Sequence, residues 1–138
     1  MAKLTSIKLD MKKVNEGIWF LFMADIEVLV ARKPNSVYLE KLECLMEPHM
    51  QNIRNGKFTQ AQDRELTIEA VVGTVLLNWK NIEDDRGKTI PFSVAEALAI
   101  LSDPSFEDFY NFILQCAHDR EQYRVNSEAE AVKNLQSA

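Results

Sequence analysis

The feature of the sequence that most constrains its fold is AVVGTVLLNW, residues 70–79, a run without a charged side chain. Upstream of it, Thr59 and Gln62 have the spacing of a capping box, which favours a helix that begins near residue 60. The sequence therefore predicts a helix over about 60–80 that is amphipathic in its first half and apolar on nearly all sides in its second half. A helix end of this kind must be buried on every side.

Two interpretations of this run stay open. In the first, the run is a central core helix of the chain itself. In the second, one of its faces is covered only by another subunit or by a binding partner. Under the second interpretation the candidate partner-binding residues are Val71, Val75, Leu76 and Trp79.

Strand patterns precede this helical region, between residues 5 and 32. Apolar and polar residues alternate in IKLDM, GIWFLFM is rich in aromatic residues, and IEVLV is rich in β-branched residues. Ala24 and Asp25 form a short break between the last two segments. We therefore expect a hairpin that pairs residues 17–23 with residues 26–32, whose turn type is open because the Asn-Gly signal is absent.

Helical signals dominate residues 36–124. The sequence predicts a helix capped by Asn35 or Ser36, a second helix that begins at Pro48 and ends before Gly56, the helix over 60–80, a short helix over 94–101 opened by a Ser93–Glu96 capping box, and a last helix over about 105–124. The fold class is thus α+β, with an N-terminal β-hairpin or small antiparallel sheet followed by a mostly helical remainder. Residues 1–125 are expected to form a single globular domain, and residues 126–138 a flexible C-terminal tail.

Composition and charge exclude several classes of protein. The hydrophobic fraction of 46% and the charged fraction of 27% are ordinary for a soluble domain. The net charge of -5 argues against a nucleic-acid binder, which needs a basic surface. No stretch approaches the ~20 apolar residues of a membrane span, and the first residues lack a signal peptide. Cys44 and Cys116 lie far apart, as expected of free thiols in a reducing compartment, so we expect a cytoplasmic protein without a nucleic-acid or membrane partner.

An acidic segment, EDDRG at residues 83–87, invites a metal-binding interpretation. In a calcium-binding EF-hand loop with Gly87 at the sixth position, the twelfth position would be Ser93 rather than a bidentate glutamate. Arg86 and Lys88 also offset much of the acidic charge. We therefore expect a solvated turn in which Gly87 has a positive φ, and no metal site.

Catalytic motifs are equally weak. Cys116 and His118 lie two residues apart, which on a helix separates them by about 200° around the axis, so they cannot act as a nucleophile and its base. His49 has no evident acid or base partner. No glycine-rich phosphate loop and no nucleophile elbow occur in the sequence. The sequence therefore predicts a protein that is not an enzyme and that needs no cofactor.

Two longer segments resemble the tail assembly chaperones of long-tailed bacteriophages, the class that includes the G protein of lambda-like phages. The first segment contains GIWFLF and, after the turn, Arg32, Asn35 and Tyr38 in ARKPNSVYLEKL. The second is LLNWKNIEDDRGKTIPFS, followed by VAEALAILSDP and FEDFYNFILQCA. The order is typical of the family, in which an apolar helix ends in tryptophan, an acidic turn containing glycine follows, and Pro-Phe-Ser opens the next helix.

The resemblance implies a non-enzymatic role in the host cytoplasm. Such chaperones bind the tape-measure protein, keep it soluble while the tail tube assembles, and are absent from the mature virion. They self-associate, so a homo-oligomer is expected, and a longer form made by ribosomal frameshifting recruits the major tail subunit. The alternatives are a structural virion subunit of the tail or head-tail connector and, second, a small enzyme or metal-binding protein.

The frameshifted form makes a prediction for the gene. Val132, Lys133 and Asn134, if encoded by GTA AAA AAC, would contain the slippery sequence A-AAA-AAC. We expect such a heptamer at or near these codons, with an overlapping second reading frame downstream. Sequencing the gene checks this, and codons that cannot re-pair after a one-base slip, without a downstream frame, would contradict it.

Overall fold

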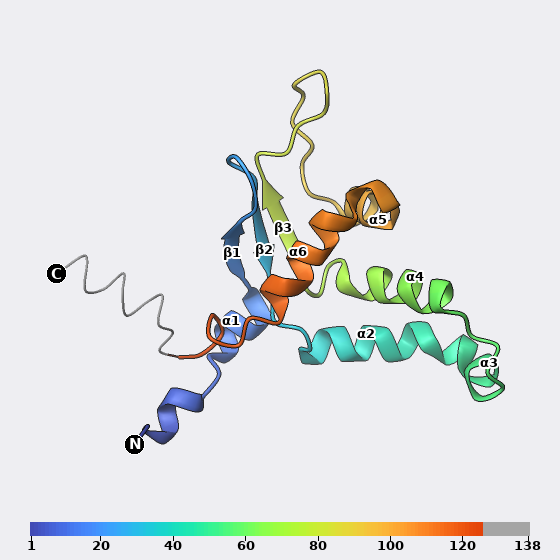
Figure 1. Ribbon diagram of the computed structural model, residues 1–138, viewed down its shortest axis with the longest axis horizontal. Helices are drawn as coiled ribbons and strands as arrows, with labels where there is room; N and C mark the ends of the chain where they lie inside the picture. Colours follow the sequence, from blue (N-terminus) through green and yellow to red (C-terminus); the bar gives the residue numbers. More distant parts are fainter. Residues whose placement is uncertain (126–138) are drawn as a thin grey trace.

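A three-stranded antiparallel sheet forms the centre of the computed structural model, which describes residues 1–125 (Figure 1). The strands are β1 (Ile18–Leu21), β2 (Glu27–Val30) and β3 (Leu76–Lys80), in the order β1-β2-β3. With helices making up most of the remaining elements, the predicted α+β class is confirmed. The expected flexible tail, residues 126–138, and the expected frameshift position lie outside the described residues.

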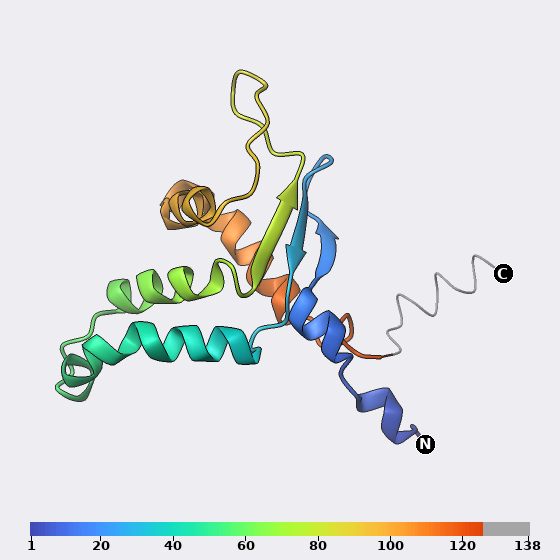
Figure 2. The ribbon, with the colours of Figure 1, turned by 180° about the vertical axis from the view of Figure 1, so that it is seen from behind.

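Helices surround the sheet unevenly. In Figures 1 and 2, α6 crosses one face of the sheet with α5 beside it, whereas α2 and α4 lie side by side as an arm that extends away from it. The elements outside the sheet are the α-helices α1 (Met11–Glu16), α2 (Ser36–Met46), α3 (Met50–Arg54), α4 (Gln60–Val71), α5 (Val94–Ser102) and α6 (Glu107–Ala117), and the 3₁₀ helices η1 (Leu4–Ile7), η2 (Glu47–His49) and η3 (Pro104–Phe106).

The predicted hairpin is confirmed, but the strand expected before it is not. β1 pairs with β2 in the register Ile18 to Val30, through a turn that contains Ala24. Residues 4–7 and 11–16 instead form η1 and α1. The Asp10 carboxylate accepts a hydrogen bond from the Lys12 N–H and so caps α1, a local contact that outweighs the short alternation of apolar and polar residues.

The predicted helix over 60–80 is wrong in its second half. The capping box of Thr59 and Gln62 is present, and α4 begins at Gln60 as expected, but it ends at Val71. Gly73 has a φ of +88° and lies in a turn after the helix, and β3 follows at Leu76. β-Branched residues such as Val72 and Val75 favour extended backbone over helix, so the uncharged run forms a turn and a strand.

The other helix predictions are largely confirmed. The Asn35 side chain accepts a hydrogen bond from the Tyr38 N–H at 2.9 Å, and the Ser93 hydroxyl accepts one from the Glu96 N–H at 3.1 Å, so both residues cap the helices they precede. Gly56 has a φ of +70° and follows α3 as expected. The last helix is shorter than predicted. α6 ends at Ala117, and turns follow it.

The core lies between the sheet and α6. Phe20, Val28 and Trp79 are partners across the three strands and therefore share the face of the sheet on which α6 packs. Tyr123, which follows α6, is fully buried, and its hydroxyl donates a hydrogen bond to the Val30 carbonyl at 2.8 Å. The chain after α6 is thus fixed to the central strand.

The conformation of Gly17, which lies between α1 and β1, predicts that a larger residue at this position destabilises the fold. Its φ is +85° and its ψ is 172°, and a Cβ atom there would lie 3.1 Å from the carbonyl carbon and oxygen of Val30. Gly17→Ala is therefore expected to lower the free energy of unfolding by at least about 1–3 kcal/mol, the cost of the backbone conformation alone. Urea denaturation followed by circular dichroism measures this change.

Gly56→Ala is the matched control. Gly56 also has a positive φ, but nothing lies within 4 Å of an added Cβ, so we expect a loss of about 1–2 kcal/mol from the left-handed backbone conformation. Equal losses in the two variants would show that the close approach of Gly17 to β2 contributes nothing.

Candidate functional site

The four candidate partner-binding residues lie in the core of the chain. Val71, Val75 and Leu76 are 0% exposed and Trp79 is 4% exposed. The burial expected under the first interpretation is therefore met by the chain's own sheet and helices. None of the four side chains offers surface to a partner in this structure.

The acidic loop after β3 is a turn that is held by hydrogen bonds within the chain. The Asp84 carboxylate accepts hydrogen bonds from the backbone N–H groups of Arg86 and Lys88, both at 2.9 Å, and Gly87 has the positive φ predicted for it. The indole N–H of Trp79 donates to the Ile90 carbonyl at 2.8 Å and holds the base of the loop. The loop projects from the body of the molecule (Figure 1). In the described part of the chain, no group of three or more His, Cys, Asp and Glu residues could hold a metal ion.

Cys116 and His118 occupy different environments, as predicted. Cys116 is buried on the apolar face of α6, and burial raises the pKa of its thiol to about 12. His118 is exposed at the end of the helix, and partial burial together with the cations Lys33 and Arg32 lowers its pKa. A thiol protonated at neutral pH is a poor nucleophile, so the environment of Cys116 does not favour a catalytic pair with His118.

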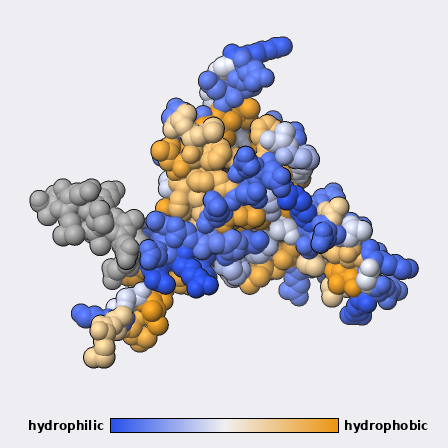
Figure 3. Space-filling view, viewed as in Figure 1, coloured by the Kyte–Doolittle hydropathy of each residue, from blue (hydrophilic) through white to orange (hydrophobic). Residues whose placement is uncertain are grey.

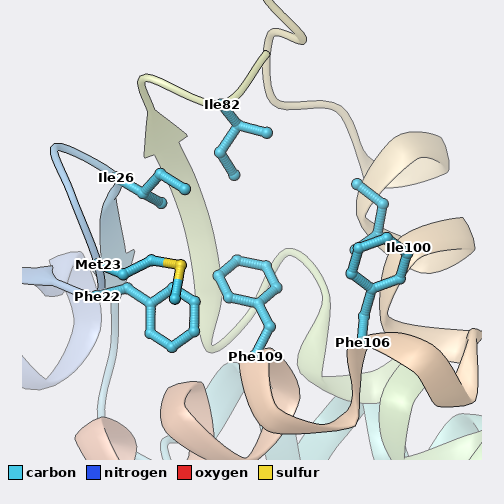
Figure 4. A pocket seen from close by; sticks show the side chains of 7 residues that line it. All are labelled: Phe22, Met23, Ile26, Ile82, Ile100, Phe106 and Phe109. Atoms are coloured by element: carbon cyan, nitrogen blue, oxygen red, sulfur yellow. The ribbon is translucent and has the colours of Figure 1, made fainter. Parts of the chain in front are cut away.

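An apolar groove opens beside the end of the sheet, and its volume is about 220 Å³. Figure 4 shows that its side chains come from the β1–β2 turn, the start of the acidic loop, α5, η3 and α6. Every lining residue is apolar: Phe22, Met23, Ile26, Ile82, Ile100, Phe106 and Phe109. Figure 3 shows apolar surface gathered in this upper part of the molecule, below the hydrophilic tip of the acidic loop.

Packing and one hydrogen bond fix the shape of this groove. Phe22 lies against two rings of α6, at centroid distances of 5.3 Å from Phe109 and 4.8 Å from Phe112. The Asn81 side-chain amide donates to the Asp25 carbonyl at 2.8 Å, which ties the acidic loop to the β1–β2 turn. The β1–β2 turn is therefore fixed against α6 on one side and against the acidic loop on the other, without a ligand.

Two groove residues remain substantially exposed although they are large and apolar. Met23 is 58% exposed and Phe106 is 45% exposed. An exposed apolar surface collected in a concave site is typical of a binding site rather than of a solvated face. No sequence motif marks this groove, because its residues lie up to 87 positions apart, from Phe22 to Phe109, and only the fold brings them together.

Comparison with known proteins gives the origin of the chain. A family model described as YdaY prophage protein matches residues 33–134, most of the sequence. The chain belongs to the YdaY prophage protein family. It is therefore a phage-derived protein, as the resemblance implied, although the family description does not specify a tail assembly chaperone. No curated protein and no solved structure matches the chain.

The match to the YdaY prophage family includes part of the groove. Ile82, Ile100, Phe106 and Phe109 lie within the matched residues, whereas the β1–β2 turn precedes them. Among residues 1–125 of this YdaY-family chain, no helix combines the length and the apolar character that crossing a membrane requires.

The two thiols provide a test of the burial in this YdaY-family protein. Cys44 is exposed and Cys116 is buried, so a disulfide-exchange reagent at pH 8 should modify one thiol rapidly and the other only after denaturation. Cys44→Ser should remove the rapid phase. Two thiols that react at the same rate in the native protein would contradict the packing of α6.

The raised pKa of Cys116 also predicts how the stability of the folded protein changes with pH. The thiol of the unfolded chain ionises near the ordinary value of 9.0, whereas the folded thiol ionises at about 12. The contribution of this group to stability is therefore complete below pH 9 and is lost as the pH rises from 9 towards 12. Urea denaturation across this pH range measures the loss, which should be smaller in Cys116→Ala when compared with its own stability at pH 7.

Proposed function

We propose that this protein is a non-enzymatic tail assembly chaperone that binds the phage tape-measure protein and keeps it soluble while the tail tube assembles. Two observations support the proposal. The chain belongs to a prophage family, and most of the segments that resemble tail assembly chaperones lie within the residues matched to that family. The exposed apolar groove supplies a surface that such a role requires.

The physical basis of the proposal is the solubility of the client. A tape-measure protein exposes long apolar stripes on its helices, and these stripes aggregate unless another surface covers them. A small domain with a preformed apolar groove can cover part of a stripe by helix-in-groove packing. The net charge of -5 helps to keep the loaded complex in solution.

The remaining parts of the proposed role follow from the resemblance. The chaperone acts in the host cytoplasm, self-associates, and is absent from the mature virion. A longer frameshifted form brings the major tail subunit to the loaded tape measure. Neither a metal nor a cofactor takes part.

Co-expression with the tape-measure protein of the same phage tests the proposal. The tape-measure protein should shift from the insoluble to the soluble fraction when the chain is present, and the two should co-purify. An unrelated acidic protein of similar size, expressed at the same level, serves as the control. A tape-measure protein whose solubility does not change would contradict the chaperone function.

Mass spectrometry of purified phage particles distinguishes a chaperone from the main alternative, a structural virion subunit. A chaperone should be missing from particles, whereas a structural subunit of the tail or connector should be present in fixed proportion to the other tail proteins. Detection at such a proportion would replace the proposal with the structural role.

A further inference from the structure

We propose that the apolar groove binds one face of an amphipathic helix whose apolar side chains are flanked by lysine or arginine. This inference rests on the proposed function, since it names the groove as the client site and states the chemistry of the client segment.

The groove is poorly suited to a small molecule. Its volume of about 220 Å³ is below the roughly 300–1,000 Å³ of typical ligand pockets. Such pockets also carry a few polar groups that orient the ligand, whereas every residue that lines this groove is apolar. A few apolar side chains of a protein partner match a site of this size and chemistry.

The backbone around the groove favours a helix over an extended strand. An added strand needs free N–H and C=O groups to pair with, and several of these groups near the groove bond within the chain. The Phe22 N–H donates to the Ile26 carbonyl, the Ile26 N–H to the Met23 carbonyl, and the Ile90 N–H to the Ile82 carbonyl. A helix satisfies its own backbone and needs only apolar contacts from the groove.

Two side chains at the mouth of the groove are suited to hold such a helix. Phe106 provides a large aromatic surface with few rotatable bonds, which is typical of residues that dominate binding energy. Met23 is flexible and polarisable and can adjust to different apolar side chains. Both are exposed and would lose water contact on binding.

The charge of the segments around the groove, here called the rim, predicts the charge of the residues that flank the apolar face of the partner helix. Segments 21–27, 82–90 and 100–109, which carry the lining residues and the whole acidic loop, contain eight acidic residues and two basic residues, Arg86 and Lys88. Only one of the eight has an ion pair with a basic side chain in the described part of the chain, the Arg64–Glu107 contact at 3.8 Å. Arg86 and Lys88 offset part of the acidic charge and leave an excess of six negative charges in these segments.

Hydrogen bonds stabilise the charged form of one carboxylate in these segments. The N–H and the hydroxyl of Ser105 both donate to the Asp103 carboxylate, and these bonds lower the pKa of Asp103. A partner with basic flanks is attracted to such a rim, and one with acidic flanks is repelled.

A fluorescent helical peptide provides the probe. It carries leucine at positions i, i+3, i+4 and i+7 and lysine at its flanks, and a second peptide replaces each lysine with glutamate. Fluorescence anisotropy with the full chain should give binding of the lysine peptide that weakens with salt, and at least about tenfold weaker binding of the glutamate peptide, a difference of about 1.4 kcal/mol. Equal binding of the two peptides would overturn the assigned rim chemistry.

Variants locate the binding site. Met23→Glu/Phe106→Glu places charge at the mouth of the groove and should weaken binding of the lysine peptide despite the added attraction to lysine, because apolar contact is lost. The matched control is Val37→Glu/Leu39→Glu, which changes two equally exposed apolar residues on α2 and should leave binding unchanged. Circular dichroism confirms that both variants fold. Equal weakening by both variants, or by neither, would overturn the assignment.

The same variants separate this inference from the proposed function. If the groove variant still keeps the tape-measure protein soluble, the groove is not the client site although the chaperone function stands. If the wild-type chain fails to do so, the proposed function fails whatever the peptide shows. Loss of self-association in the groove variant, with peptide binding unchanged, would assign the groove to a second copy of the chain and overturn the inference.

Discussion

The pairing of β3 with β2 is the interaction on which the rest of the structure depends. It joins segments about 50 residues apart in the chain, with Val28 opposite Trp79 and Glu27 opposite Lys80. This register buries Trp79 beside Phe92, with ring centroids 5.1 Å apart, and directs its indole N–H to the base of the acidic loop. The same pairing brings the end of β3 next to the β1–β2 turn, so the groove exists only because β3 is a strand.

Local signals in the sequence predicted the elements that depend on local chemistry. The cap at Asn35, the capping box of Thr59 and Gln62, and the left-handed glycine at Gly87 form as expected, and Ser93 forms its half of the predicted capping box. Each of these features depends on contacts within a few residues. The prediction that the apolar run is helical was wrong, because an uncharged segment lacks the hydrophobic periodicity that distinguishes a buried helix from a buried strand. Gly73 was the signal that could have decided it.

The groove could not be predicted from the sequence for a different reason. Phe22, Ile82 and Phe106 carry no shared motif, and their meeting depends on the strand pairing and on the packing of α6. The sequence contains an apolar surplus near Trp79, but the fold uses that surplus for its core and leaves a different set of apolar side chains exposed. The idea of a client surface survives as a proposal, and its position on the molecule has changed.

Hydrogen–deuterium exchange on the complex with the tape-measure protein tests the central claim most directly, because it reports on every segment of the chain at once. A helix bound in the groove should slow exchange at residues 22–26 and 100–109 and leave the outer half of the α2–α4 arm unchanged. Slowed exchange confined to that arm, or no change anywhere in a complex that demonstrably forms, would contradict the claim that the groove holds the client.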